Sequence, residues 1–234
     1  MNTPSSKNEG ARLAALESYR VLNTQPEADF DEITQLGSFI CGTPIALMSL
    51  VDEKRQWFKS KVGLDVDQTP REQAFCRYTI LGNELMVVED ATKDQRFAAN
   101  PLVTGYPNIR FYAGAPLLTA EGYALGSLCV IDQQPRKLSS MQEKALSALA
   151  RQVVKMLELR RITAELAAAL ENVKTLGKLL PICAYCRGIR DDKGYWQELE
   201  QYLHTRTDTK ATHGICADCE KKHFGDFTLP DLAI

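Results

Sequence analysis

The chain has 234 residues, of which 44% are hydrophobic and 25% are charged, and its formal net charge is −2. This composition is typical of a globular protein with a hydrophobic core, and it excludes the overall basic field that binding to nucleic acid or to an anionic membrane would need. Apolar runs stay well short of the roughly 20 residues of a membrane span, and no signal peptide is visible at the N-terminus. We therefore expect a cytoplasmic protein with no membrane span and no nucleic-acid partner.

Two helices are predicted near the N-terminus, after a polar tail of residues 1–8. Apolar side chains recur at helical spacing over residues 9–22, which predicts the first helix. A second helix is predicted after Pro26, and it ends at Gly42. Its apolar stripe consists of Phe30, Ile33, Leu36 and Ile40.

Strand patterns fill the next ninety or so residues. The run "PIALMSLVDE" carries apolar residues on both faces of a strand, which is typical of a strand covered on both sides. Further strands are predicted in "RQWFKSKVG", "LMVVED", "IRFYAGAPLL" and "YALGSLCVID", and a short helix in "REQAFCRYTI". The order of elements predicts an α+β fold, in which helices flank one antiparallel sheet of five to six strands.

A long helix follows, and its start is marked by Ser139 or Ser140 with Glu143, a capping-box pattern. From Leu159 onward apolar residues alternate at spacings of three and four, which predicts a coiled-coil seam. The seam consists of Leu159, Ile162, Leu166, Ala169, Val173, Leu176 and Leu180. The alternative is an amphipathic helix lying on its own domain, which the wider stripe and the lack of complementary flanking charges favour. Pro181 ends the helix.

Several ordered blocks carry a resemblance to a known family, among them "PREQAFCRYTIL", "VVEDATKDQRFAANPLVTGYPNIRFYAGAPL" and "GYALGSLCVID". In these blocks the first 160 residues resemble the GAF domain of bacterial signalling proteins, in the subgroup found at the front of sensor kinases and cyclic-dinucleotide enzymes. The resemblance implies a small-molecule pocket on one face of the sheet and signal output through the terminal helices. The block "LPICAYCRGIRDDKGYW…HGICADC" is similar to a short cysteine module appended to bacterial GAF, PAS and receiver proteins, from which no activity transfers.

Four of the seven cysteines form two Cys-x-x-Cys pairs separated by 29 residues: Cys183, Cys186, Cys216 and Cys219. Two such pairs complete a tetrahedral zinc site, so we expect one zinc ion per chain, although the spacer is longer than usual for this pattern. His213 is an alternative ligand. The other interpretations are reduced structural thiols or a redox dithiol, and the latter would need a strand rather than a helix before Cys183. Residues 181–226 carry seven basic and eight acidic side chains, which again argues against nucleic acid.

Candidate residues for the small-molecule pocket are Trp57, Phe75, Cys76, Arg110 and Tyr112. Aromatic residues in a sheet are more often core than pocket. Arg110 would lie at a rim or face an anion. Cys76 and Cys129 raise the alternative of a thiol enzyme that reduces free methionine sulfoxide. A single cysteine in a core is usually a small buried hydrophobic residue, however, and no histidine precedes His204 to act as its base.

The expected protein is a non-enzymatic GAF sensor or adaptor of bacterial signal transduction, with a small-molecule ligand or a signalling protein as its partner. It would form a homodimer through the long helix and carry a structural zinc module. The alternatives are the sulfoxide-reducing thiol enzyme and a ligand-free scaffold. The expected division of the chain is a tail at 1–8, a GAF domain at 9–158, a coiled-coil helix at 159–180, a zinc module at 181–226 and a tail at 227–234.

Overall fold

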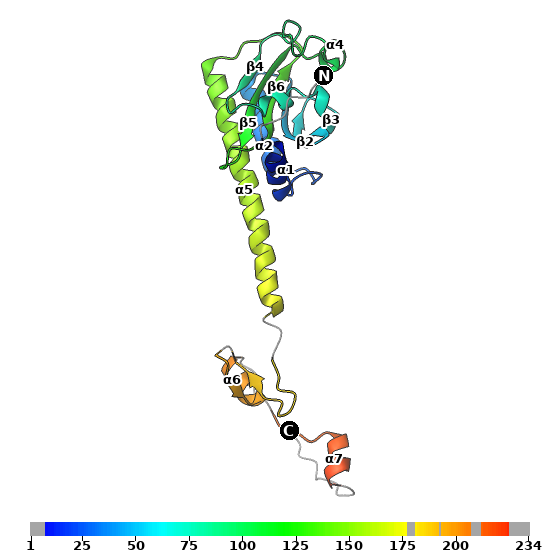
Figure 1. Ribbon diagram of the computed structural model, residues 1–234, viewed down its shortest axis with the longest axis vertical. Coiled ribbons are helices and arrows are strands. Elements are labelled where there is room, and N and C mark those ends of the chain that lie inside the picture. The colour runs from blue at the N-terminus through cyan, green and yellow to red at the C-terminus, as the bar shows by residue number, and fades with distance from the viewer. Residues whose placement is uncertain (1–7, 177–180, 192, 207–211, 225–234) are drawn as a thin grey trace. The chain divides into compact units, whose positions relative to one another are not determined.

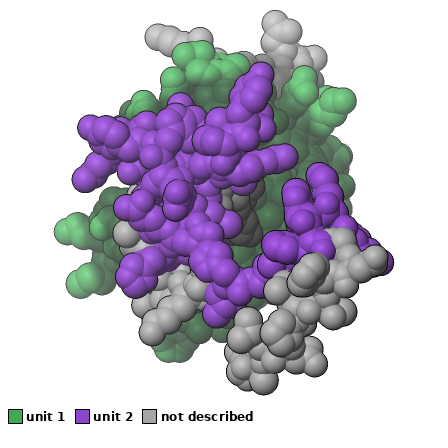
Figure 2. Space-filling view, turned by 90° about the horizontal axis from the view of Figure 1, so that it is seen from below, with its two compact units in different colours: residues 1–167 green, residues 168–234 purple. Residues whose placement is uncertain are grey.

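The chain divides into two compact units, residues 1–167 and residues 168–234, which Figure 2 shows in different colours. The computed structural model describes residues 8–176, 181–191, 193–206 and 212–224. No helix in these ranges is both long enough and apolar enough to cross a bilayer.

The first unit is built on a six-stranded antiparallel sheet with the strand order β3-β2-β1-β6-β5-β4 (Figure 1). This order confirms the predicted α+β fold. The strands are β1 (Ile45–Val51), β2 (Arg55–Val62), β3 (Gln68–Pro70), β4 (Met86–Val88), β5 (Phe111–Leu118) and β6 (Ala124–Asp132). Strand β3 was not predicted, because its three residues carry no apolar alternation, and it forms by pairing with the edge of β2.

Helices cover both faces of this sheet (Figure 1). One face packs against α1 (Glu9–Ser18), α2 (Ala28–Cys41) and the first turns of α5 (Ser140–Leu176). The other packs against the short helices α3 (Cys76–Thr79) and α4 (Pro101–Thr104). Strand β1 is buried along its whole length for this reason, as its apolar run predicted.

Two predicted helices are shorter in the structure. Helix α1 ends at Ser18 rather than near residue 22, because Arg20 and Asn23 adopt φ angles of 47° and 61° that a right-handed helix excludes. The segment predicted as one helix in "REQAFCRYTI" is a 3-10 turn, Arg71–Gln73, followed by α3. Ala74 separates the two with an extended backbone.

Helix α5 begins with a reciprocal cap, although its partners differ from the predicted pair. The Ser139 N–H donates to Oε1 of Gln142 at 2.9 Å, and the Gln142 N–H donates back to the Ser139 hydroxyl at 3.3 Å. Gln142, not Glu143, therefore completes the capping box. The helix then buries Leu146, Ala150, Val153 and Leu157 against the sheet.

Beyond residue 158 the apolar stripe of α5 is exposed. Leu159, Ile162 and Leu166 are 66%, 48% and 59% exposed, so the first unit does not cover them as the packed-helix alternative would require. Helix α5 remains helical through Leu176. The predicted seam positions Val173, Leu176 and Leu180 lie outside the residues whose side chains the structure describes.

The second unit contains the end of α5 and a small hairpin with two helices. Its elements are β7 (Ile189–Arg190), β8 (Trp196–Gln197), α6 (Leu199–Arg206) and α7 (Ala217–Phe224). The helix predicted over "GYWQELEQYLHT" begins only at Leu199. Its first residues instead turn the hairpin, because Gly194 adopts a φ of 90° and the Tyr195 N–H donates to the Asp191 carboxylate at 2.8 Å.

Candidate functional site

A partly open cavity of about 130 Å³ lies on the α3–α4 face of the sheet. Its inner wall is formed by side chains of β1, β2, β5 and β6, and α3, α4 and the segment before β3 surround it. Most of the lining is aliphatic or aromatic, and none of the lining side chains is charged. The polar groups at its wall include Gln56, Cys76 and Tyr112. The cavity therefore suits a small neutral molecule with few polar groups.

Three of the five candidate pocket residues meet at this cavity: Phe75, Cys76 and Tyr112. The ring of Phe75 stacks on Phe97 at a centroid distance of 3.9 Å and lies 5.1 Å from the ring of Tyr112. These contacts fix the aromatic wall.

The structure places the other two candidates elsewhere. Trp57 faces the opposite side of the sheet, in the core with α1, α2 and α5, because it alternates with Gln56 and Phe58 along β2. The Arg110 guanidinium donates to the carbonyl oxygens of Val103 and Ile109 at 2.8 and 3.1 Å. Arg110 therefore anchors the segment after α4 and does not line the cavity.

A group of polar side chains surrounds the Cys76 sulfur, and sequence reasoning missed most of it. The sulfur lies 2.9 Å from the Ser127 hydroxyl, 3.1 Å from Gln56 Nε2, 3.2 Å from the Ser49 hydroxyl and 3.3 Å from the Tyr112 hydroxyl. The Cys129 sulfur lies 3.9 Å away. We call this the Cys76 cluster: Ser49, Gln56, Cys76, Tyr112, Ser127 and Cys129. All six side chains are buried.

The strand register explains how the Cys76 cluster forms. Ser49 of β1 pairs with Ser127 of β6, and Cys129 lies two residues along β6 on the same face. The single serine in each of the largely apolar strands β1 and β6 was a usable signal, because a buried hydroxyl needs a polar partner.

Gly114 gives the Tyr112 ring the room it needs. The two residues share a face of β5, and a Cβ atom on Gly114 would stand 2.1 Å from the Tyr112 hydroxyl oxygen. Tyr112 therefore lies along its own strand, and its hydroxyl also contacts the Thr79 hydroxyl of α3 at 2.7 Å. A larger residue at position 114 would push Tyr112 away from Cys76.

The two buried thiols of the cluster differ in acidity. Burial raises the pKa of Cys76, but hydrogen bonds from Cys129, Ser127, Ser49 and Tyr112 outweigh it and hold the pKa below its usual range. The hydrogen bond to Cys76 and burial raise the pKa of Cys129 well above its usual value. Cys76 is thus the more acidic of the two thiols, without a histidine beside it, and Cys129 is the less acidic. By contrast, burial alone raises the pKa of Cys41 to about 11.

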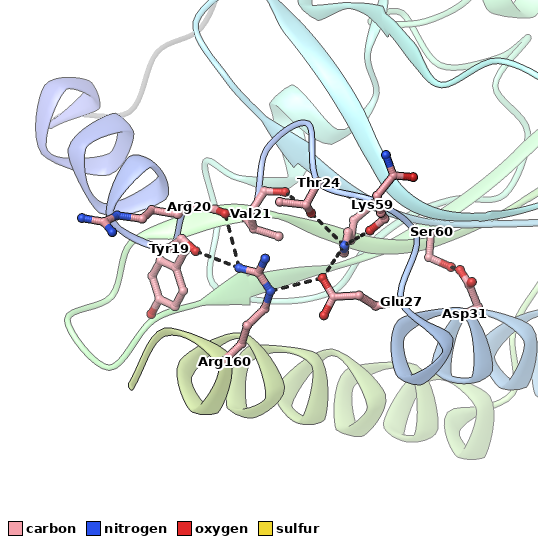
Figure 3. Close-up of polar contacts among 10 residues, drawn as sticks. Tyr19, Arg20, Val21, Thr24, Glu27, Asp31, Lys59, Ser60 and Arg160 are labelled. Carbon is pink, nitrogen blue, oxygen red and sulfur yellow. Dashed lines mark hydrogen bonds and ion pairs between the residues drawn. The ribbon is translucent and has the colours of Figure 1, made fainter. Parts of the chain in front are cut away.

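An ionic network on the opposite face of the sheet joins strand β2 to helix α5 (Figure 3). Lys59 of β2 donates to Glu27 Oε1 at 2.6 Å, and Arg160 Nε of α5 donates to the same oxygen at 3.1 Å. Lys59 also donates to the Thr24 hydroxyl and the Gln25 carbonyl. We call Lys59, Glu27 and Arg160 the Glu27 tether.

The Glu27 tether depends on a β-bulge. Met48 pairs with Ser60 and Ser49 pairs with Phe58, so Lys59 is the extra residue between them. The adjacent Phe58 lines the cavity on the other face. A displacement of β2 at Phe58 would therefore reach α5 through one neighbouring residue.

The paired cysteines of the second unit lie in two separate turns. The first turn is closed by the Cys183 N–H donating to the Gly188 carbonyl at 2.8 Å, with Arg187 at a φ of 63°. The second pair stands at the start of α7, where the Glu220 N–H donates to the Cys216 carbonyl at 2.9 Å. Within residues 181–224, as far as the structure describes them, no three His, Cys, Asp or Glu side chains group around a common point.

Each turn nevertheless presents a sulfur suited to a metal. Backbone N–H groups of Cys186 and Tyr185 lower the pKa of Cys183, and those of Cys219 and Asp218 lower the pKa of Cys216, so both favour the thiolate that zinc requires. The donor set thus fits zinc chemically. The imidazole of His213 instead faces the Glu200 carboxylate at 3.2 Å.

Comparisons with known proteins agree with the sheet architecture. Residues 25–157 match the GAF domain family. A cyclic di-GMP phosphodiesterase of Pseudomonas aeruginosa is 46% identical over 161 residues, which make up 68% of this chain and 27% of the phosphodiesterase. The chain therefore matches little more than a quarter of that relative.

Two solved structures share the fold at a TM-score of 0.51 and 13% identity. The GAF domain of a phosphoenolpyruvate-protein phosphotransferase from Coxiella burnetii matches over 68% of this chain and 97% of that domain. The PixJ GAF domain of Thermosynechococcus elongatus, in its blue-light absorbing form, matches over 69% and 96%. Identity this low supports the shared fold alone.

Proposed function

The chain belongs to the GAF domain family, and from that membership we propose that it acts as a sensor or adaptor in bacterial signal transduction. The first unit binds a small neutral molecule in the cavity, and helix α5 carries the response. The observation that supports this function best is the uncharged cavity with the Cys76 cluster at its wall. Three of the predicted pocket residues converge there: Phe75 and Cys76 at the start of α3, and Tyr112 of β5.

The ligand class follows from the lining. Apolar walls give the ligand its affinity, and Gln56 and Tyr112 orient one polar group of the ligand. A charged ligand would lose its hydration without meeting an opposite charge. An apolar cavity of about 150 Å³ admits benzene, so a cavity of about 130 Å³ suits a ligand of similar size.

The response leaves the first unit through the Glu27 tether. A ligand that presses on Phe58 shifts β2, and the buried Lys59 transmits that shift to Glu27 and Arg160. Because the Lys59 side chain is fully buried, its charge cannot leave Glu27 without a large desolvation cost. Ligand binding thus changes how α5 is held against the sheet.

The exposed stripe of α5 serves as a dimer contact. Leu159, Ile162 and Leu166 are all about half exposed or more, and they follow the three-and-four spacing of a coiled coil. A second copy of the chain presents the same stripe, so a homodimer buries both.

The sensor also has a signalling context and a C-terminal zinc module. The relative from Pseudomonas is named as a cyclic di-GMP phosphodiesterase, which favours a place in cyclic-dinucleotide signalling. One zinc ion, held by Cys183, Cys186, Cys216 and Cys219, links the two cysteine turns of the second unit. When bound, this ion supplies a structural cross-link and no reaction chemistry.

Ligand binding is tested with phenol as the probe, with benzene for comparison. Both should raise the melting temperature of the full chain, and phenol more so, because its hydroxyl can bond to Gln56 or Tyr112. Leu64→Trp fills the cavity from a half-exposed position and should abolish both shifts. Leu36→Trp, on the exposed side of α2, should leave them unchanged. An unchanged melting temperature with both phenol and benzene would favour the ligand-free scaffold.

A further inference from the structure

The paired thiols of the Cys76 cluster have a chemistry that sensing alone does not use. Their sulfurs lie 3.9 Å apart although 53 residues separate them in the chain. A disulfide requires about 2.05 Å, so the sulfurs must approach by about 1.9 Å. The thiols are reduced in this structure.

We propose that Cys76 and Cys129 form a two-electron redox couple, in which Cys76 reduces a small neutral alkyl hydroperoxide in the cavity and Cys129 then closes a disulfide. This inference rests on the proposed use of the cavity as a binding site. It goes beyond that use by giving the site a covalent reaction.

The access of the two sulfurs assigns their roles. Cys76 lines the cavity and meets whatever enters it, whereas Cys129 is buried beneath it on β6 and does not line the cavity. Cys76 is therefore the residue that attacks, and Cys129 the residue that resolves. The opposite pKa shifts of the two thiols agree with these roles, because attack needs a thiolate and resolution supplies a proton.

The uncharged lining selects the oxidant. Free methionine sulfoxide carries an ammonium and a carboxylate, and no lining side chain could pair with either. A glutathione-sized disulfide would not fit in about 130 Å³. A hydroperoxide with a short alkyl group is neutral and apolar at one end, and its two oxygens can accept hydrogen bonds from Gln56 and Tyr112 at the other.

The reaction balances in two steps. The Cys76 thiolate attacks the terminal peroxide oxygen, so that an S–O bond forms and the O–O bond breaks. The departing alkoxide takes up the proton that the Cys76 thiol released on ionisation and becomes the alcohol. Cys76 is now a sulfenic acid. The Cys129 sulfur attacks the Cys76 sulfur, the S–S bond forms, and the S–O bond breaks with the oxygen leaving as water. Two thiols lose two electrons in total, and the hydroperoxide becomes an alcohol and water.

The Cys76 cluster supports this chemistry through its donors. Ser127, Ser49 and Gln56 stabilise the attacking thiolate, and the Tyr112 hydroxyl lies within reach of the leaving oxygen. Disulfide closure draws the start of α3 toward β6. Because Cys76 also lines the cavity, oxidation and ligand binding act on the same wall.

The experiment uses the reduced full chain and one equivalent of tert-butyl hydroperoxide, without added thiol. Peptide mapping after alkylation should show a Cys76–Cys129 disulfide. In Cys129→Ala the reaction should stop at the sulfenic acid of Cys76, which dimedone labels. In Cys76→Ala the thiols of the first unit should consume the peroxide at least tenfold more slowly. Cys41→Ala, which removes a buried cysteine outside the cluster, should leave both rate and disulfide unchanged.

Entry through the cavity is tested separately. Leu64→Trp should slow oxidation by tert-butyl hydroperoxide at least tenfold. The rate of oxidation by hydrogen peroxide should fall less, because the smaller oxidant needs less room. Equal rates in Leu64→Trp and wild type, or oxidation confined to the four C-terminal cysteines, would overturn the proposal. If phenol still raises the melting temperature in that case, the redox couple fails while the sensor function stands.

Discussion

The sheet unit and the cysteine segment of this chain hold their structures in different ways. Both faces of the sheet carry a continuous buried cluster, with α1, α2 and α5 on one side and α3 and α4 on the other. Between residues 181 and 224, by contrast, Ile189 is the one buried side chain among those that the structure describes. The difference shows that burial supports the fold of the first unit, whereas so little is buried in the described part of the segment that we expect a cross-link to order its turns.

Loss of the proposed zinc ion should sharpen this contrast most. Cys183→Ser should lose the metal and the hydrogen-exchange protection of residues 181–224, because a structural zinc ion contributes roughly 10–16 kcal/mol in small peptides. The melting of the sheet unit should not change. Elemental analysis and hydrogen exchange measure the two effects, with Cys41→Ala as the zinc-retaining control. A metal-free wild type with protected amides in this segment would contradict the prediction.

A change at Gly114 should show how tightly the sheet unit is packed. Gly114→Ala places a Cβ against the hydroxyl and ring of Tyr112. The clash should destabilise the unit by about 1–3 kcal/mol and move Tyr112 away from Cys76. Gly10→Ala is the matched control, because its Cβ meets nothing within 4 Å in α1, and it should stabilise the protein by about 0.5–1 kcal/mol. Denaturant unfolding measures both. Equal effects of the two substitutions would mean that Tyr112 is not confined.

The ion pairs of α1 should make the stability of the sheet unit depend on pH. Burial raises the pKa of Glu9, but its bonds to Arg12 and Arg71 outweigh it and lower the pKa from 4.5 to about 2. Because the pKa of Glu9 is lower in the folded state, its charge contributes to the free energy of unfolding above pH 4.5. This contribution is lost as the pH falls from about 4.5 toward 2.

Glu9→Gln should therefore cost about 1–2 kcal/mol at pH 7, after allowance for solvent screening, and progressively less below pH 4.5. The free energy of unfolding of wild type and variant, measured across this range, tests the sign. A difference that does not shrink in acid would show that packing of Glu9, and not its charge, matters.

The smallest effect on folding should come from the exposed stripe of α5. Leu166→Lys should change the stability of the sheet unit by no more than about 0.5 kcal/mol, because the side chain is exposed there. It should nevertheless shift a dimer toward monomer in sedimentation, since a charge enters the proposed seam. Thr163→Lys, exposed on the same helix outside the seam, is the control. A wild-type monomer at high concentration would remove the basis for the dimer.

Local pattern was enough to predict the main elements of the fold. The apolar run of β1, the alternation in β2 and the hairpin of β5 and β6 depend on spacing along one strand, which the sequence displays directly. The errors fell where a backbone turn overrides that pattern. Arg20 and Gly194 adopt positive φ angles, and each ends or displaces a predicted helix.

The sequence by itself determined the antiparallel sheet, the long helix and the two Cys-x-x-Cys pairs, because each rests on residues a few positions apart. Only the tertiary structure decided which polar groups meet. Ser49, Cys76 and Cys129 come together through the register of β1 against β6 and the break before α3. Lys59 reaches Glu27 because a bulge turns it to the helical face. Such contacts depend on how distant strands align, and a shift of one residue would send these side chains to the other face.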